Sequence, residues 1–175
     1  MSCKLEEIPR PLALGSEEFI SLRELFGRSF KAARIGVWEC SLPDQTLSWT
    51  DTVYEFFDLV PQAPLARDEI VKLYTPETRK LLNEARDRAI RTGEGFTLDA
   101  QIVTAKGNNR WIRITACVEF ANGTAARIFG VKQDITAEKA VVEQLRHLAE
   151  RDALTGLSSR TRFETFLSEI CGAEG

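Results

Sequence analysis

The stretch Arg110-Trp-Ile-Arg-Ile-Thr-Ala-Cys-Val-Glu-Phe120 places an apolar side chain at every second position, as a β-strand with one buried face does. The dipeptide Asn122-Gly123 follows, and both residues tolerate the positive φ angles of a tight hairpin turn. We expect the returning strand to span Ile128 to Gln133. Upstream, residues 96–103 alternate with the same period before a turn at Gly107-Asn108-Asn109. The C-terminal half therefore predicts three consecutive antiparallel strands.

The N-terminal part predicts a helix followed by a hairpin. Ser16-Glu17-Glu18 is a typical helix start, and apolar residues then recur every three or four positions, so we expect an amphipathic helix over residues 17–33. The runs Ile35–Leu42 and Thr46–Trp49 are β-like, and the Pro-Asp turn between them predicts a hairpin. Residues 1–15 have no helical period, and we interpret them as a tail.

Three helices are expected between the hairpin and the later strands. Asp51 is placed to cap a short helix from Thr52 to Asp58, and a second short helix is expected from Arg67 to Leu73. Thr75-Pro76-Glu77 is the strongest start signal in the chain, and the helix that it opens should end near Gly93. The predicted order is β-β-α-α-α-β-β-β, which is typical of an antiparallel α+β domain.

This order, together with three short motifs, resembles a PAS domain over residues 20–136. The motifs are Gly36-Val-Trp-Glu39, Arg110-Trp-Ile-Arg113 and Gly130-Val-Lys-Gln-Asp-Ile-Thr136. The resemblance implies an α+β PAS fold with a five-stranded antiparallel sheet and helices on one face. The N-terminal helix would flank this domain, which we bound at residues 16–136.

An uninterrupted helical pattern follows the last predicted strand, and Thr136 is placed to cap it. A heptad seam runs along this pattern at spacings of four, three and four: Val141, Leu145, Leu148 and Asp152. We expect residues 137–153 to form a signalling helix that joins two copies of the chain as a coiled-coil linker. The alternative is a helix that packs back on its own domain.

The segment Asp152-Ala-Leu-Thr-Gly-Leu-Ser-Ser-Arg-Thr-Arg-Phe163 resembles the opening motif of the GGDEF family, whose domains make cyclic di-GMP; Ser159 stands where Asn is usual. We interpret residues 154–175 as the truncated start of such a domain, with the nucleotide-binding loop expected beyond Gly175. The resemblance implies a non-catalytic sensor that dimerises and controls a diguanylate cyclase-like output. The alternatives are a ligand-free interaction and dimerisation module, or the regulatory part of a full-length active cyclase.

The PAS resemblance also implies a pocket between the helices and one sheet face. Strand parity and helix faces suggest an apolar lining: Trp38, Cys40, Phe56, Phe57, Leu73, Phe96, Leu98, Ile112 and Ile114. The alternative is that these side chains only fill the core. Residues 76–92 contain no histidine, and no cysteine lies between Cys40 and Cys117, so neither histidine-ligated haem nor a cysteinyl-flavin adduct is expected. The cofactor is unknown, a small metabolite or none.

A signal junction is expected where the last strand meets the exit helix, at Asp134, Ile135 and Thr136. Asp134 would form a hydrogen bond across this corner and transmit strain from the sheet; the alternative is a local turn followed by a helix cap. Arg110 and Arg113 would either bind an anion or keep one sheet face solvated.

The composition excludes several classes of protein. A net charge of −3 argues against a nucleic-acid binder, and no run of 18 apolar residues is present to span a membrane. The four cysteines form no close pair and the chain has one histidine, which favours a reduced, cytoplasmic location and gives no metal-ligand spacing. The expected partners are a second copy of the chain and a small-molecule ligand.

Overall fold

A computed structural model describes residues 25–150 of the chain, with side chains up to His147. It contains two compact units, one ending at Ile135 and the other beginning at Thr136, and each is described by itself. The predicted tail, the first part of the predicted helix 17–33, Asp152 and the predicted GGDEF segment lie outside the described residues.

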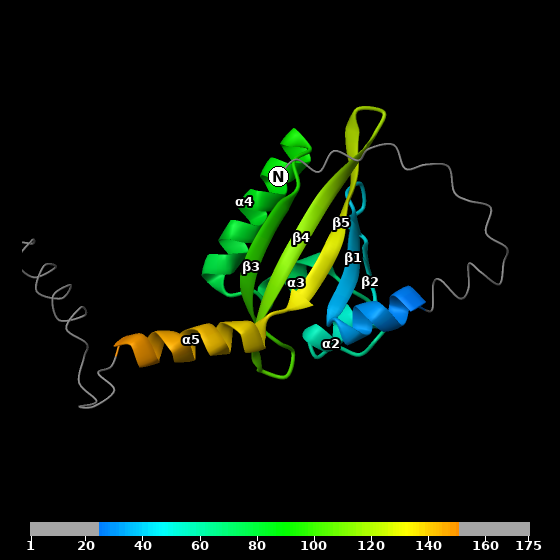
Figure 1. Cartoon of the computed structure of the whole chain (residues 1–175). Coiled ribbons are helices and arrows are strands. Elements are labelled where there is room, and N and C mark those ends of the chain that lie inside the picture. Colours follow the sequence, from blue (N-terminus) through cyan, green and yellow to red (C-terminus); the bar gives the residue numbers. More distant parts are fainter. Residues whose placement is uncertain (1–24, 151–175) are drawn as a thin grey trace, which may run out of the picture. The chain divides into compact units, whose positions relative to one another are not determined.

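The first unit is built on one five-stranded antiparallel sheet (Figure 1). Across the sheet the strands are β2 (Leu47–Trp49), β1 (Ile35–Ser41), β5 (Thr124–Asp134), β4 (Asn109–Ala121) and β3 (Phe96–Val103). Three helices connect β2 to β3: α2 (Asp51–Phe56), α3 (Arg67–Lys72) and α4 (Pro76–Thr92). The predicted fold class and element order are therefore confirmed.

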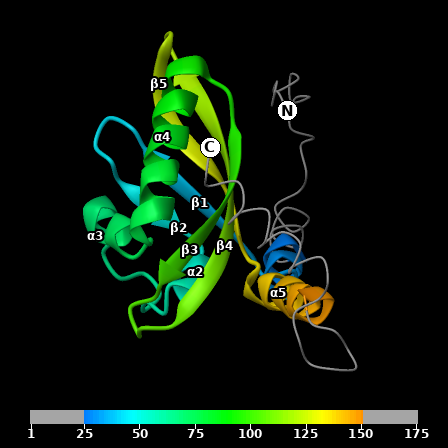
Figure 2. The same cartoon turned by 90° about the vertical axis from the view of Figure 1, so that its left-hand side faces the viewer.

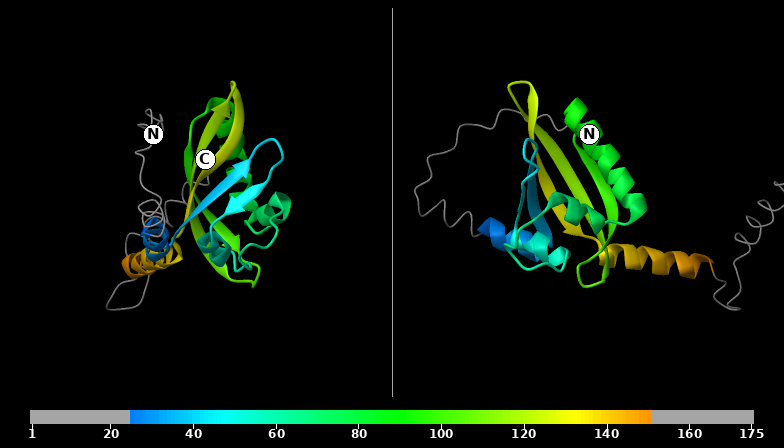
Figure 3. Two further views of the ribbon diagram at one scale, coloured as in Figure 1. Left: turned by 90° about the vertical axis from the view of Figure 1, so that its right-hand side faces the viewer. Right: turned by 180° about the vertical axis from the view of Figure 1, so that it is seen from behind.

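The helices α3 and α4 cover one side of the sheet, and the N-terminal helix, residues 25–32, lies on the other side (Figures 2 and 3). The second unit begins with α5 (Thr136–Glu150). A single apolar core lies between the sheet and α2, α3 and α4. Its most deeply buried large side chains are Val53, Phe57, Ile102, Ile112, Ile114 and Ile128.

The turn at Asn122-Gly123 forms as predicted, with φ angles of 52° and 78°. The predicted start of the last strand at Ile128 was wrong, because β5 begins directly after the turn with Thr124 opposite Ala121. A register shift lies between Glu119 and Phe120, where Phe120 is 43% exposed and its ring is near Gly93 at the end of α4.

The start of α2 differs from the prediction. Thr50, not Asp51, is the N-cap residue, and Asp51 is the first residue of the helix, where its negative charge favours the helix dipole. The Thr50 Oγ1 accepts a hydrogen bond from the Val37 N–H at 3.0 Å and donates one to the Val37 carbonyl at 3.3 Å. The cap position is thus used to attach the helix to β1. By contrast, α4 begins after Thr75 and ends at Gly93, as predicted.

The central strand β5 requires a glycine at position 130. Gly130 lies opposite Trp38 of β1 and Ala116 of β4, so a neighbouring strand flanks it on each side. A Cβ atom at this position would overlap the Thr115 carbonyl oxygen, which belongs to the backbone and cannot rotate away. The close packing of β5 against β4 therefore depends on the missing side chain.

We expect Gly130→Ala to lower the free energy of unfolding by about 2–3 kcal/mol, because the added methyl group forces β4 and β5 apart. Urea denaturation of the chain measures this change. The matched control is Gly27→Ala in the N-terminal helix, where nothing lies within 4 Å of the added atom, and here stability should be unchanged or slightly higher. Equal midpoints for Gly130→Ala and the unmodified chain would contradict the close packing.

Candidate ligand-binding pocket

A pocket of about 60 Å³ lies between the sheet and the helices α3 and α4, with room for water or a ligand of a few non-hydrogen atoms. Every strand contributes to its walls. The lining residues are Trp38, Cys40, Leu47, Trp49, Arg67, Ile70, Val71, Tyr74, Leu82, Arg86, Phe96, Ile114, Ile128 and Lys132. Most of these side chains are apolar, and the charged exceptions are Arg67, Arg86 and Lys132.

Four of the nine predicted lining residues are in the wall of the pocket: Trp38, Cys40, Phe96 and Ile114. The other five lie elsewhere in the same unit: Phe56, Phe57, Leu73, Leu98 and Ile112. Among these, Phe56, Phe57 and Ile112 are fully buried core residues, whereas Leu73 and Leu98 are half-buried. Strand parity identified the correct face of the sheet but not the distance of each side chain from the cavity.

Lys132 was missed from the sequence and is the most unusual residue of the pocket. It lies on β5, its side chain is buried with 5% exposure, and its ammonium nitrogen lies over three aromatic rings. The nitrogen is 4.5 Å from the ring centre of Trp49, 4.9 Å from Phe57 and 5.2 Å from Trp38. Cation–π attraction of this kind offsets part of the cost of removing a charge from water.

Burial lowers the pKa of Lys132 from 10.5 to about 7, because desolvation disfavours the charged form, and this outweighs the opposing effect of Cys40. Burial also raises the pKa of the Cys40 thiol, with the nearby Arg86 and Arg67 acting in the opposite direction. Burial raises the pKa of Tyr74 as well. Near neutral pH, Lys132 is therefore the group in the pocket wall that changes charge.

Two arginines also line the pocket. The side chain of Arg86 on α4 is 17% exposed, and its guanidinium donates to the Gln45 Oε1 at 2.7 Å. Arg67 at the start of α3 is 23% exposed. Desolvation and the neighbouring Arg67 lower the pKa of Arg86. The two guanidinium groups add to the positive potential that Lys132 creates inside the pocket.

Two further polar atoms of the pocket have unused hydrogen-bonding capacity. Within residues 25–150, the indole nitrogens of Trp38 and Trp49 are buried and have no hydrogen-bond partner. A buried N–H group without an acceptor is destabilising, so each such group in a folded protein calls for an explanation. Both indoles belong to the ring cluster around Lys132.

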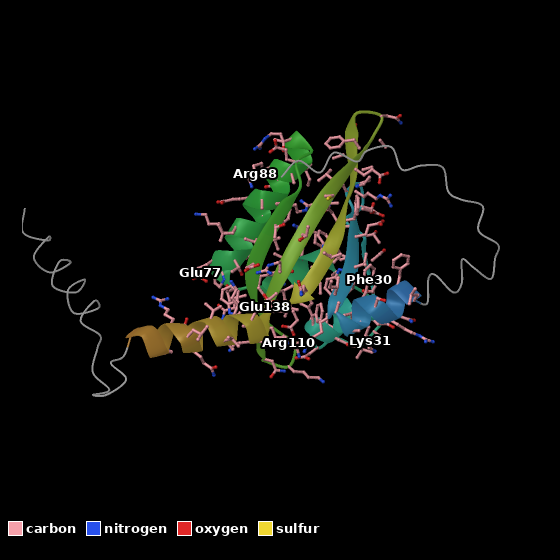
Figure 4. All side chains as sticks on the ribbon, viewed as in Figure 1. Phe30, Lys31, Glu77, Arg88, Arg110 and Glu138 are labelled. Carbon is pink, nitrogen blue, oxygen red and sulfur yellow. The ribbon has the colours of Figure 1, made fainter. Side chains whose placement is uncertain are left out.

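The strand arginines do not belong to this pocket. Arg110 donates to the Glu55 and Phe56 carbonyls at 2.7 and 2.9 Å and forms an ion pair with Asp58 at 2.7 Å, so it closes the C-terminal end of α2 (Figure 4). Hydrogen bonds from Thr104 and Asn108 hold the pKa of Asp58 below its ordinary value.

Arg113 is likewise engaged, in a two-point ion pair with Asp99 at 2.8 and 3.1 Å. The predicted alternative of a solvated arginine face was therefore incomplete, because both Arg110 and Arg113 are held by specific partners.

At the predicted junction, Asp134 forms an ion pair with Arg34 at 2.5 Å. Arg34 directly precedes β1 and has a φ angle of 53°, which few residues other than glycine adopt. Ile135, which follows Asp134 in the chain, is fully buried, and its N–H donates to the Trp111 carbonyl at 2.9 Å. The α5 helix then begins at Thr136. The end of β5 is thereby tied to the start of β1.

The predicted seam is described only in part. Val141 and Leu145 on α5 are 54% and 61% exposed, and their neighbour Val142 is 62% exposed. The side chain of Leu148 and all of Asp152 lie outside the described residues.

Among residues 25–150, no helix is long and apolar enough to cross a membrane.

A sequence profile described as the PAS fold matches residues 46–132. The chain contains a PAS domain. Two kinds of curated relative match: a blue-light-activated histidine kinase of Brucella ovis, 26% identical over 109 residues, and the probable diguanylate cyclase DgcE of Escherichia coli (strain K12), 27% identical over 126 residues. These matches cover 62% and 71% of this chain, but it spans only 22% and 11% of the two relatives.

Solved structures share the fold of this PAS domain. The sensory box histidine kinase/response regulator from Burkholderia thailandensis E264 aligns with a TM-score of 0.60 at 17% identity, covering 71% of this chain and 95% of the other. The N-terminal domain of a diguanylate cyclase with PAS/PAC sensor from Marinobacter aquaeolei aligns with a TM-score of 0.55 at 14% identity, covering 60% and 98%. At these identities the likeness concerns the fold alone.

We expect Lys132→Met to raise stability near pH 7 and to remove a pH dependence. Because the folded-state pKa is lowered, the unfolded chain binds a proton more tightly, so the unmodified protein gains stability as pH rises from about 7 toward 10.5. Between pH 7 and pH 9 this gain is about 2 kcal/mol. Urea denaturation at both pH values should show the gain in the unmodified chain and not in Lys132→Met.

The control for this prediction is Lys80→Met on the exposed face of α4, which should keep the pH dependence of the unmodified chain. A gain that persists undiminished in Lys132→Met would show that another group causes it.

Proposed function

We propose that this PAS domain is a sensory module that dimerises through α5 and controls a diguanylate cyclase-like output. The observation that carries the proposal is the position of β5. This strand contributes Ile128 and Lys132 to the pocket, ends at the Asp134–Arg34 ion pair and leads within two residues into α5. A change in the pocket therefore acts on the strand from which the exit helix starts.

The proposed output has support from two directions. The motif from Asp152 to Phe163 resembles the start of a GGDEF domain. One curated relative is named a probable diguanylate cyclase, and another is named a histidine kinase. In this proposal the chain itself is non-catalytic. The proposal places the chain in the cytoplasm, where a thiol such as that of Cys40 stays reduced.

The seam on α5 supplies a physical reason for dimerisation. Val141 and Leu145 leave apolar surface in water, and burying one leucine side chain is worth about 1.5–3 kcal/mol. A parallel pair of helices in contact along the seam buries this surface twice, once in each copy. Cyclases of the GGDEF family join two GTP molecules held on facing domains, so the spacing of the two helices would set the output.

A second candidate function is that of a ligand-free interaction module. Leu25, Phe26 and Phe30 expose 60%, 51% and 39% of their surface on the N-terminal helix, and the rings of Phe26 and Phe30 are 6.1 Å apart. Figure 4 shows the Phe30 side chain on this helix. Such a patch favours contact with another protein surface. If this helix alone forms the dimer, changes in the α5 seam will leave self-association unaffected.

We expect Leu145→Asp to weaken self-association of the chain at least about tenfold, because two charges would enter an apolar contact and each lost leucine contact costs more than 1.4 kcal/mol. Sedimentation equilibrium of the chain measures the dimer dissociation constant. His147→Asp is the matched control, since it places the same charge near the opposite face of α5, and it should dimerise as the unmodified chain does.

Equal dissociation constants for Leu145→Asp and His147→Asp would show that the seam is not the interface. The output can be tested in a fusion that carries a complete, active GGDEF domain in place of residues 154–175. In this fusion Leu145→Asp should lower the rate of cyclic di-GMP formation from GTP, whereas His147→Asp should not. Equal rates would remove the support for control through α5.

A further inference from the structure

We propose that the pocket binds a small monocarboxylate, whose carboxylate group pairs with the Lys132 ammonium group while its short apolar part lies among the pocket's aromatic and aliphatic side chains. This inference names the ligand class of the proposed sensory module and rests on that function. Three observations carry it: a buried cation that lacks a counter-charge, two indole donors that lack acceptors, and walls that are otherwise apolar.

The missing counter-charge is the first observation. None of the residues lining the pocket is acidic, and within the described part of the chain Lys132 has no hydrogen bond or ion pair. A buried ammonium group ordinarily has a carboxylate partner, since isolated burial of a charge is strongly unfavourable. The three rings around the nitrogen compensate only part of this cost. A bound carboxylate would supply the remaining partner.

The indole donors are the second observation. Trp38 belongs to β1 and Trp49 to β2, and these two residues are directly opposite in the register of the hairpin. The rings that carry these buried N–H groups surround the Lys132 ammonium group, and all three residues line one small cavity. A carboxylate accepts several hydrogen bonds at once, so one such group can satisfy donors that the protein leaves unused.

The walls decide between kinds of anion. Ile70, Ile114 and Ile128 present aliphatic surface, and the volume of about 60 Å³ admits only a few non-hydrogen atoms. A phosphate dianion would enter this apolar space with more charge than Lys132 alone can balance. The two arginines of the lining already have acidic neighbours, since Arg67 lies 3.8 Å from Asp68 and Arg86 lies 3.8 Å from Asp87. A monoanion with a short hydrocarbon tail matches both the charge and the surface.

Binding should be coupled to protonation of Lys132. The titratable and charged groups around it come from four parts of the unit: Cys40 on β1, Arg67 on α3, Arg86 on α4, and Tyr74, which precedes α4. None of them is an acid that would hold the ammonium group charged. With the pKa of free Lys132 at about 7, affinity should change little from pH 7 down to the range where a carboxylic acid itself takes up a proton, and it should fall by up to about tenfold per pH unit above pH 7.

The test uses propionate as the probe and propionamide, which has the same size and shape but no charge, as its neutral match. Two-dimensional NMR of the chain follows the indole N–H resonances. We expect propionate to shift the signals of Trp38 and Trp49 and not that of Trp111, to bind at least about tenfold more tightly than propionamide, and to bind about tenfold or more weakly at pH 8.5 than at pH 6.

Three variants locate the site. Lys132→Met should weaken propionate binding at least about tenfold, Trp49→Phe should weaken it severalfold because it keeps a ring but removes an N–H donor, and Lys80→Met should leave it unchanged. Thermal denaturation confirms that each variant is folded, and Lys132→Met is expected to be more stable than the unmodified chain near pH 7.

Four outcomes would overturn the inference. They are equal affinities for propionate and propionamide, undiminished binding in Lys132→Met, tighter binding of inorganic phosphate than of propionate, and no saturable shift at propionate concentrations up to about 100 mM. If Leu145→Asp weakens the dimer but the binding tests fail, the proposed linker is supported and only the proposed ligand class is lost. If the chain binds propionate as expected but Leu145→Asp does not weaken its dimer, the ligand class is retained and the proposed linker is lost.

Discussion

The pairing of β5 with both β1 and β4 is the constraint on which the domain depends. The last strand in sequence occupies the centre of the sheet, so the first hairpin and the β3–β4 pair are joined only through it. Gly130 permits its close contact with β4, and the ion pair between Asp134 and Arg34 fixes its end beside the start of β1. The same strand forms part of the pocket and continues toward α5, so in the proposed sensory module one set of contacts would serve both structure and signalling.

The buried Lys132 on β5 lowers the stability of the domain. A pKa of about 7 in place of 10.5 corresponds to about 5 kcal/mol of folding free energy, a large fraction of the 5–15 kcal/mol by which domains are stable. A methionine in the same place would fill similar space without that cost. Residues that destabilise a fold in this way are typical of sites retained for binding or chemistry. The aromatic rings and the orphan indole donors around Lys132 are consistent with such a site.

The strands, the tight turn and the long helix were predictable from the sequence because their burial follows a regular period and their ends carry glycine or proline. The pocket was predictable only in part. Lys132 was overlooked because lysine is ordinarily exposed, although its spacing of four from Ile128 places both on the same face of β5. The positions of Arg67 and Arg86 depend on how α3 and α4 pack, and Gln45, the hydrogen-bond partner of Arg86, is 41 residues away from it. No local pattern encodes such contacts.

The central place of β5 also has a consequence for synthesis on the ribosome. Residues that pair across the β1–β5 ladder are up to about one hundred positions apart, so the hairpin of β1 and β2 emerges long before its main partner. Until residue 134 has left the exit tunnel, β1 and β4 each present an unpaired edge of backbone donors and acceptors. Chains interrupted within this interval are the species most prone to aggregate, and a chaperone that shields strand edges would act on them first.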